Sequence, residues 1–258
     1  MLLRCTGLFG NTGAMTSDGA PYFVAPRLAR IDWLVHGFGR AGWGEEDILA
    51  SPDFRGFRPV VMRQLHSNII HRLDGNPAGK LEGDALMTDV RGLLLVVRTA
   101  DCLPALLVDE THKAVASVHC GWRGTEKRIL EKAVQAMGRA YGSEPGELLA
   151  ALGPCIGSAC YEVGPEVREG FRRAGFPPDV LADSQTRHGK SLLDLRRANT
   201  WLLGSLGVKP AGIWSADACT HCDPGLLSYR RNKGEPRRMY NFIGVRPRSG
   251  GEEPGHYF

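Results

Sequence analysis

Residues 93–125 read LLLVVRTADCLPALLVDETHKAVASVHCGWRGT. Three short apolar runs lie within this stretch, at Leu93–Val97, Ala105–Val108 and Ala114–Val118, and turn residues bound each of them. Short apolar runs that are rich in branched side chains predict buried strands. We therefore expect three consecutive strands that form the centre of a sheet.

Helical periodicity begins directly after this stretch. Apolar residues recur at helical spacing between Thr125, which predicts an N-cap, and Gly142, which predicts the end of the helix. Asp194 is a further capping residue, and Pro165 suits the first turn of a helix. The remaining predictions are helices at Pro165–Ala174 and Leu195–Leu206 and strands at Gly212–Ser215 and Met239–Val245.

Alternation of strands and helices predicts the fold class. It favours a layered α/β domain with mixed β-sheets, and no linker, repeat or low-complexity segment divides the 258 residues. We expect residues 19–258 to form one catalytic domain. Residues 1–18 begin like a signal peptide, but glycine and polar residues interrupt the apolar run that such a peptide needs. They are expected to form a flexible N-terminal tail.

Composition excludes several classes of protein. The chain is 43% hydrophobic and 23% charged, and it lacks a run of about 18 apolar residues, so we expect no membrane span. Seven cysteines, an odd number, indicate reduced thiols in the cytoplasm rather than a disulfide framework. The net charge of +4 comes without a basic cluster, which argues against nucleic-acid binding and favours small anionic ligands.

Three potential metal ligands lie at or near the ends of predicted strands. They are His66 in QLHS, Cys102 in TADCLP and His119 in HCGWRG. Neighbouring strand ends can bring such residues together although they are far apart in the sequence. Two imidazoles and one thiolate suit zinc, and three protein ligands leave the fourth tetrahedral position for water or substrate.

The segment after His119 predicts an anion site. Gly121–Gly124 joins a predicted strand to the N-terminus of the predicted helix, where backbone N–H groups favour an anion. Arg123 adds a guanidinium group that suits phosphate. The GxxxxGK[ST] spacing of a nucleotide-hydrolysing loop is absent.

Several motifs together resemble one known family. The chain is similar, from His36 to its end, to the zinc-dependent purine nucleoside phosphorylases, a family formerly described as laccase-type multicopper polyphenol oxidases. The resemblance implies one α/β/β/α layered domain and zinc on the two histidines and Cys102. It also implies phosphorolysis of adenosine, inosine, guanosine and methylthioadenosine, with deamination of adenosine as a side activity. The motifs that carry it are QLHS (His66), GDAL (Asp84), TADCLP (Cys102), HCGWRG (His119), GPCI with CYEV (Gly153–Val163) and SYRR (Ser228–Arg231).

Further residues are assigned roles as hypotheses. Arg40, Arg123 and Arg230 are expected to bind phosphate, and purine nucleosides and phosphate are the expected partners. Asp84 and Asp101 are expected to orient a ligand histidine or to transfer protons, so both are predicted as catalytic residues together with Arg123. Cys219 and Cys222 form a single CxxC motif, which is a weak signal for a second metal or redox site. We expect a monomer or a weak homodimer.

Three other functions fit parts of the same pattern. A copper-dependent polyphenol oxidase is disfavoured because the eight histidines form no H-x-H pair, although copper remains an adventitious substitute for zinc. Cys102 activated by a histidine could instead serve a cysteine hydrolase or an amidase that edits cell-wall precursors. Cys120 as a fourth ligand would make the zinc purely structural.

Overall fold

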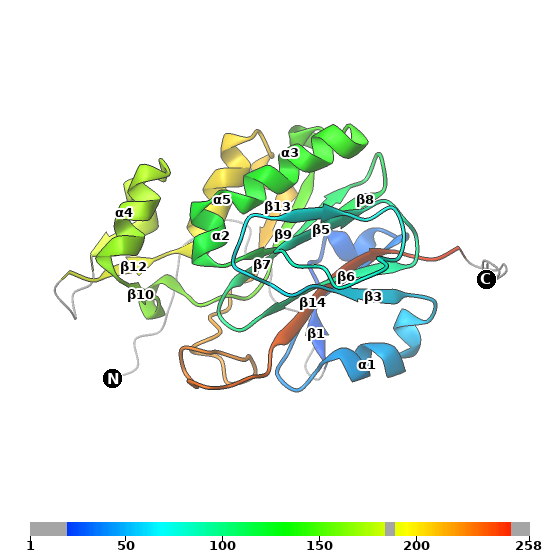
Figure 1. Cartoon of the computed structure of the whole chain (residues 1–258), viewed down its shortest axis with the longest axis horizontal. Coiled ribbons are helices and arrows are strands. Elements are labelled where there is room, and N and C mark those ends of the chain that lie inside the picture. The colour runs from blue at the N-terminus through cyan, green and yellow to red at the C-terminus, as the bar shows by residue number, and fades with distance from the viewer. Residues whose placement is uncertain (1–19, 184–188, 249–258) are drawn as a thin grey trace.

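Two stacked β-sheets form the centre of the molecule (Figure 1). A computed structural model describes residues 20–183 and 189–248. The predicted tail at residues 1–18 lies outside these ranges. Within them, no helix has both the length and the apolar composition that crossing a membrane requires.

The first sheet has five strands in the order β1-β2-β14-β6-β3. Its neighbours are antiparallel except for β3 and β6, which are parallel. The prediction of a strand at Met239–Val245 is confirmed by β14, which pairs along its length with β6. The strands are β1 (Tyr22–Phe23), β2 (Leu34–Gly39), β3 (Arg58–Val61), β6 (Leu93–Thr99) and β14 (Met239–Val245).

The second sheet has six strands in the order β13-β9-β7-β8-β5-β4. Its four inner strands are antiparallel to one another, and the outer strands β13 and β4 each pair in parallel with their neighbour. The sheets are therefore mixed, as predicted. The strands are β4 (Ile70–Arg72), β5 (Ala85–Thr88), β7 (Leu103–Asp109), β8 (Ala114–Cys120), β9 (Leu149–Leu152) and β13 (Ile213–Ser215).

The expectation that three consecutive strands form the centre of one sheet is wrong. All three strands exist, but β6 lies in the five-stranded sheet while β7 and β8 pair in the six-stranded sheet. The chain crosses from one sheet to the other at Ala100–Cys102. Each sheet is covered on both faces, so its strands are continuous apolar runs. Such runs do not show whether two successive strands pair within one sheet or lie in two stacked sheets.

Burial on both faces of each sheet produces the layers. Leu93, Leu95 and Val97 of β6 pack between the sheets, whereas Leu94 and Val96 pack on the outer side. The alternation follows from the opposite directions of successive side chains in a strand. The side chains of this single strand therefore contribute to two apolar layers, one on each face of the sheet.

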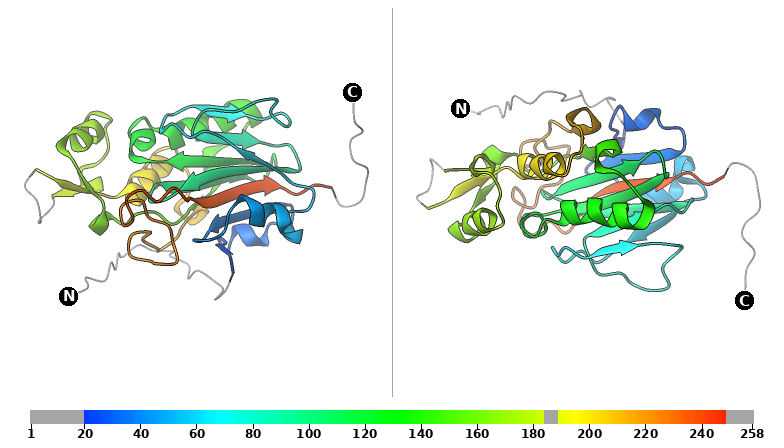
Figure 2. Two further views of the ribbon diagram at one scale, coloured as in Figure 1. Left: turned by 60° about the horizontal axis from the view of Figure 1, so that its bottom comes forward. Right: turned by 90° about the horizontal axis from the view of Figure 1, so that it is seen from above.

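Helices cover the outer faces of both sheets. Helices α3 (Ile129–Tyr141) and α5 (Leu195–Ser205) lie side by side over the six-stranded sheet (Figure 2). Helix α1 (Glu45–Ala50) buries Ile48 against the other sheet. The α/β/β/α order is confirmed. Asp194 caps α5 as predicted, since its carboxylate accepts the backbone N–H of Arg197 at 2.8 Å.

The helix after β8 begins later than predicted. The short helix α2 (Trp122–Glu126) comes first, and α3 begins after Arg128, whose φ of 59° interrupts the helical path. Thr125 is therefore inside α2 and is not an N-cap; its hydroxyl accepts a hydrogen bond from Asn199 at 3.2 Å. Gly142 ends α3 as predicted, with a φ of 77°.

A small sheet and a helix lie at one end of the molecule (Figure 1). Helix α4 (Pro165–Arg173) confirms the prediction of a helix with proline in its first turn. The small sheet is antiparallel throughout. Its strands are β10 (Glu162–Val163), β12 (Ser191–Leu193) and β11 (Leu181–Asp183).

A neutral histidine lies in the layer between the sheets. His36 of β2 is 4% exposed, and its Nε2 accepts the backbone N–H of Ala25 at 2.9 Å. Burial lowers the pKa of His36 from 6.5 to about 4. The native state therefore resists protonation of a side chain that the unfolded chain protonates readily.

Acid should destabilise the fold through His36. Below pH 6.5 the unfolded chain binds a proton that the folded chain excludes, so this contribution is complete above pH 6.5 and is lost as the pH falls towards 4. Between pH 8 and pH 5 the free energy of unfolding should fall by about 2 kcal/mol more in the wild type than in His36→Gln. Urea denaturation of both proteins at the two pH values measures the difference. An equal fall in both would contradict the assignment of a neutral buried His36.

Candidate metal centre

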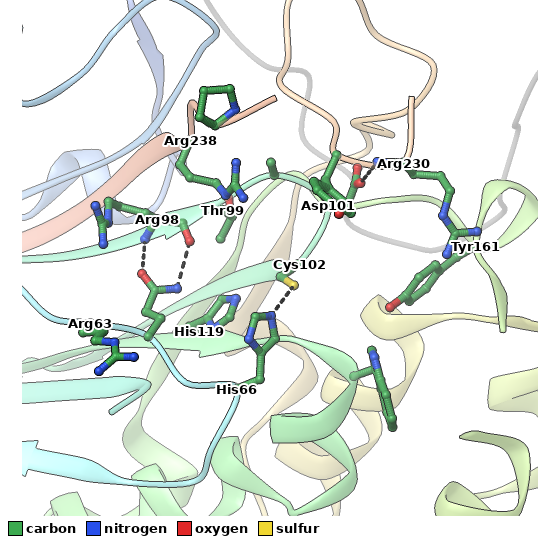
Figure 3. A pocket seen from close by; sticks show the side chains of 15 residues that line it. Arg63, His66, Arg98, Thr99, Asp101, Cys102, His119, Tyr161, Arg230 and Arg238 are labelled. Atoms are coloured by element: carbon green, nitrogen blue, oxygen red, sulfur yellow. Dashed lines mark hydrogen bonds between the residues drawn. The ribbon is translucent and has the colours of Figure 1, made fainter. Parts of the chain in front are cut away.

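A cavity of about 710 Å³ opens where the ends of the two sheets meet (Figure 3). Its wall contains the C-terminal ends of β6 and β8 and the loops that follow β3 and precede β14. Four arginines, three tyrosine or tryptophan side chains and the three predicted metal ligands line it. The cavity therefore combines positive charge, aromatic surface and potential metal ligands.

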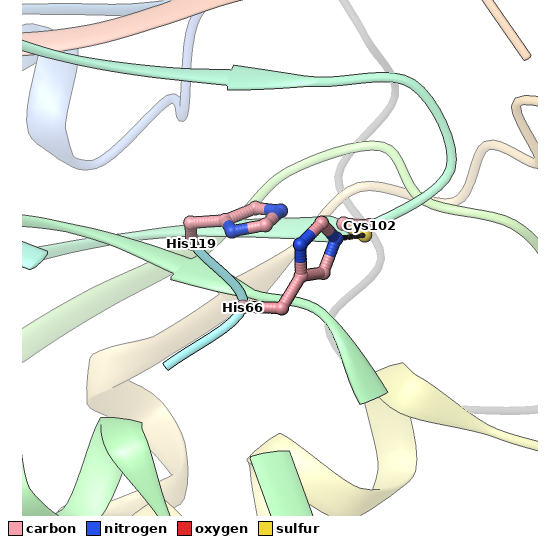
Figure 4. Close-up of side chains that lie close together, drawn as sticks. All are labelled: His66, Cys102 and His119. Atoms are coloured by element: carbon pink, nitrogen blue, oxygen red, sulfur yellow. Dashed lines mark hydrogen bonds between the residues drawn. The ribbon is translucent and has the colours of Figure 1, made fainter. Parts of the chain in front are cut away.

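His66, Cys102 and His119 lie together at this cavity (Figure 4). Their ligand atoms are all within 4.8 Å of one another, and Cys102 Sγ lies 3.9 Å from His66 Nε2. The centroids of the two imidazole rings are 4.9 Å apart, with an angle of 75° between the ring planes. Three ligands that converge in this way can hold one metal ion and leave a position open.

Strand geometry positions His119 and removes Cys120 from the site. Both residues end β8, where successive side chains point to opposite faces. His119 lines the cavity, whereas Cys120 is fully buried among the apolar side chains beneath α3. Cys120 is therefore not a fourth ligand in this arrangement, and the structural zinc clip that the sequence allowed is not supported.

Asp84 holds both histidines in place. Its Oδ1 accepts a hydrogen bond from His119 Nδ1 at 2.8 Å, which leaves Nε2 of that ring for a metal. The same carboxylate accepts the backbone N–H groups of Leu65, His66 and Ser67, and the Ser67 hydroxyl at 2.6 Å. His66 adopts a φ of 56° in the turn that these bonds fix. Asp84 is fully buried, so the geometry supports the orienting role that the sequence analysis assigned to it.

The charges of Cys102 and His119 stabilise each other. Burial alone would raise the pKa of the Cys102 thiol, but the charge of His119 and hydrogen bonds from both histidines lower it from 9.0 to about 6. Burial would lower the pKa of His119, but the charge of Cys102 and the bond to Asp84 raise it from 6.5 to about 9. Without metal, the contact therefore favours the thiolate of Cys102 and the imidazolium of His119. A metal cation can take the place of that proton.

The backbone around the three ligands leaves room for an ion. A Cβ atom at Gly121 would lie 2.9 Å from His66 Cδ2, 3.1 Å from Cys102 Sγ and 3.6 Å from His119 Cε1. Any side chain at this position would enter the space that the three residues share. The donor set and this glycine fit zinc, for which one thiolate and two imidazoles are ordinary ligands.

Asp101 and Arg230 meet in the cavity wall. Asp101 has a φ of 95° and directly precedes Cys102. Its carboxylate accepts hydrogen bonds from the Thr220 hydroxyl and the Arg230 backbone N–H, both at 2.7 Å. Arg230 also donates to the backbone carbonyl of Glu162 at 3.1 Å. Asp101 and Arg230, both predicted from the sequence as site residues, therefore lie in the wall of the same cavity as the predicted metal ligands.

The other two predicted phosphate ligands lie elsewhere. The Arg40 guanidinium stacks 3.9 Å from the Phe23 ring and does not line the cavity. Arg123 is exposed and is not among the residues that line the cavity, but its guanidinium lies 4.3 Å from the ring of Trp122, which does line it. Arg123 belongs to the five-residue helix α2, so it does not stand at the N-terminus of the long helix as expected.

Three arginines of the cavity were missed by the sequence analysis. They are Arg63, Arg98 and Arg238, which come from the five-stranded sheet or the segments next to it. Gln64 fixes the backbone of Arg98 through two hydrogen bonds, of 2.9 and 2.7 Å. A charged residue that ends the apolar run LLLVV, three positions before an aspartate, was the available signal for Arg98.

Comparison of the whole chain with known proteins agrees with this geometry. Residues 47–246 match the model of a family described as multi-copper polyphenol oxidoreductase laccase. The chain belongs to this family. Among similar proteins of the laccase-like family, a purine nucleoside phosphorylase of Deinococcus radiodurans is 38% identical over 92% of this chain and 97% of its own length. An adenosine deaminase, RL5, from an unknown prokaryotic organism is 38% identical over 67% of this chain and 69% of its own.

Solved structures of the laccase-like family share the fold. YlmD from Geobacillus stearothermophilus superposes with a TM-score of 0.80 at 28% identity, over 90% of this chain and 99% of that one. The YfiH protein of Bacillus licheniformis gives a TM-score of 0.78 at 27% identity, over 88% and 98% of the two chains. The arrangement of the two sheets is therefore that of these relatives.

Loss of the Asp84 carboxylate should weaken metal binding. Asp84→Asn keeps the shape of the side chain but cannot accept all the hydrogen bonds that orient His66 and His119. We expect affinity for zinc to fall about 10- to 100-fold, measured by competition with a chromophoric chelator. Asp109→Asn is the matched control, because Asp109 is also buried and bonded to a histidine, His112 Nδ1 at 2.8 Å, but does not line the cavity. Equal affinities in both variants would refute the orienting role.

Cys120→Ala should leave the metal in place. The Cys120 side chain packs beneath α3, and burial raises the pKa of its thiol well above the ordinary value, so it does not offer a thiolate to the site. Zinc content by elemental analysis is expected to equal that of the wild type. Loss of zinc from this variant would instead support the hypothesis that Cys120 is the fourth ligand of a structural zinc site.

Proposed function

We propose that this chain is a zinc-dependent purine nucleoside phosphorylase with a secondary adenosine deaminase activity. The observation that carries the proposal is a group of two histidines and one cysteine at a cavity lined by four arginines. The names of the relatives in Deinococcus radiodurans and of RL5 support the same pair of activities. Adenosine, inosine, guanosine and methylthioadenosine are the proposed substrates.

Phosphate would bind among the cavity arginines. Arg98 is the strongest candidate, because it lines the cavity from the end of β6 and Gln64 fixes its backbone through two hydrogen bonds. Arg238 and Arg230 line the same cavity, and the guanidinium of Arg123 lies against Trp122, which also lines it. Guanidinium groups bind phosphate oxygens through pairs of parallel hydrogen bonds. This set replaces Arg40, whose guanidinium stacks on Phe23.

Aromatic side chains offer faces for a purine ring. Trp122, Tyr161 and Tyr229 line the cavity together with the arginines. A flat base can stack on such rings, and a stacked aromatic pair contributes about 0.5–1.5 kcal/mol beyond its buried area. The proposed ligand, a purine with a sugar and a nearby phosphate, therefore matches both the apolar and the charged parts of the wall.

The metal would be held by His66, Cys102 and His119. When bound, zinc in a three-ligand site supplies a Lewis acid that acidifies a water molecule, which is the chemistry that deamination of a purine requires. Asp101 is the carboxylate in the cavity wall, and each of its oxygens keeps a lone pair beyond the one hydrogen bond it accepts. We assign proton transfer to Asp101 rather than to Asp84, which is fully enclosed.

A cysteine hydrolase or amidase is the second candidate. The observation in its favour is the lowered pKa of Cys102, about 6, because a thiolate beside an imidazolium is also the nucleophile of such enzymes. The two functions differ in the state of the sulfur. A thiolate that ligates zinc is not available for attack or for alkylation.

Phosphate-dependent release of free base tests the proposal. Adenosine and inosine should each yield free base only when phosphate is present, with about one zinc ion at this site per chain, and Cys102→Ala should lose the zinc ion of this site together with the activity. Arg98→Met should raise the KM for phosphate about 10- to 100-fold, since charged hydrogen bonds contribute about 1.5–3 kcal/mol. Arg91→Met is the control, because Arg91 bonds to the carbonyl of Arg246 and does not line the cavity.

One set of results would favour the cysteine hydrolase over the phosphorylase. If protein with intact thiols contains no metal at this site, releases no base, and is alkylated by iodoacetamide at Cys102, the phosphorylase proposal fails and the cysteine hydrolase takes its place. Conversion of adenosine to inosine without release of free base would leave only the deaminase, and release of hypoxanthine together with free ribose would indicate a nucleoside hydrolase.

A further inference from the structure

Three further thiols converge outside the cavity. Cys219 and Cys222 belong to the CxxC motif, and Cys160 comes from the short 3-10 helix Ser158–Cys160. Their sulfur atoms all lie within 4.8 Å of one another, and those of Cys160 and Cys222, 62 positions apart in sequence, are 3.4 Å apart. None of the three lines the cavity.

The spacing of the sulfurs suits ligands of one ion. In a tetrahedral site with metal–sulfur distances of about 2.3 Å, neighbouring sulfurs lie roughly 3.8 Å apart. A disulfide requires about 2.05 Å. The observed separation of Cys160 and Cys222 is far beyond a bond and close to the distance between two ligands.

Backbone N–H groups prepare one of these thiols as a thiolate. Cys219 Sγ accepts the N–H of Gly157 at 3.1 Å, and a Cβ at Gly157 would approach this sulfur to 3.2 Å. The thiolate is the form that binds metal.

We propose that Cys160, Cys219 and Cys222 form a second metal site that binds one zinc ion. Three thiolates favour a soft or borderline cation over magnesium or calcium, and zinc accepts three sulfurs with a fourth ligand from solvent. Cys222 is exposed, so solvent reaches this side of the cluster. The inference is independent of the reaction proposed for the cavity.

An ion at these thiols would join two loops of the cavity wall. Cys160 directly precedes Tyr161, which lines the cavity. Cys219 directly precedes Thr220, whose hydroxyl binds Asp101. Arg231 already ties the second loop together through the carbonyls of Thr220, His221, Asp223 and Leu226 at 2.6–3.0 Å. The role of the site is therefore structural, because it fixes the distance between Tyr161 and Asp101.

Metal stoichiometry of the full chain tests the site apart from any activity. We expect reduced wild-type protein to bind about two zinc ions, Cys102→Ala about one, and Cys102→Ala with Cys222→Ser none. Cobalt added to metal-free Cys102→Ala should give near-ultraviolet bands from thiolate ligands, which Cys222→Ser removes. Cys222 is chosen because an exposed residue tolerates serine better than the more buried Cys219.

Cys155→Ala is the matched control. Cys155 pairs with Cys219 through a β-bridge but is buried, and burial raises the pKa of its thiol to about 12. Its loss should leave the stoichiometry unchanged. Either of two results overturns the proposal. One is that Cys102→Ala with three titratable thiols at the cluster binds neither zinc nor cobalt. The other is that Cys160 and Cys222 are isolated from freshly lysed cells as a disulfide without metal.

Discussion

The buried carboxylate of Asp84 is the constraint on which the candidate metal centre depends. It directly precedes β5, which pairs with β8, and it bonds both to the ring of His119 and to the turn that carries His66. A carboxylate enclosed in this way is stable as an anion only because its hydrogen bonds replace water. Those bonds, with the charge of His119, lower the pKa of Asp84 to about 2 although burial would raise it. The same group therefore sets the orientation of two ligands and the charge beneath them.

Much of the fold could be predicted because its strands and helices have strong local signals. The strand at Met239–Val245, the helix that proline opens at Pro165, and the cap at Asp194 all depend on residues within a few positions of one another. The membership of β6 in a different sheet from β7 could not be predicted in this way. That choice depends on pairing with β14, more than a hundred residues away, which no local pattern records.

The candidate metal ligands were predictable from the sequence, and most of the arginines of the cavity were not. His66, Cys102 and His119 are uncommon residue types at strand ends, so the chemistry of each side chain identified it. Arginines are frequent in this chain, and their type alone does not separate Arg98, which lines the cavity, from Arg40, which stacks on a phenylalanine. The sequence did not show that Cys160 lies beside Cys219 and Cys222. These residues belong to two loops that are far apart in the sequence and meet only in the folded chain.

The crossing of the chain between the sheets at Ala100–Cys102 separates two parts of the cavity. Cys102 and His119 are attached to β7 and β8 of the six-stranded sheet and His66 lies in the loop between β3 and β4, whereas Arg98 and Arg238 are attached to β6 and β14 of the five-stranded sheet. Substitutions in β6 and β14 can therefore alter the charge and shape of one part of the cavity wall while the strands that carry Cys102 and His119 stay unchanged. A fold arranged in this way lets the two parts of the cavity wall change one at a time, and chains similar to this one carry the names purine nucleoside phosphorylase and adenosine deaminase.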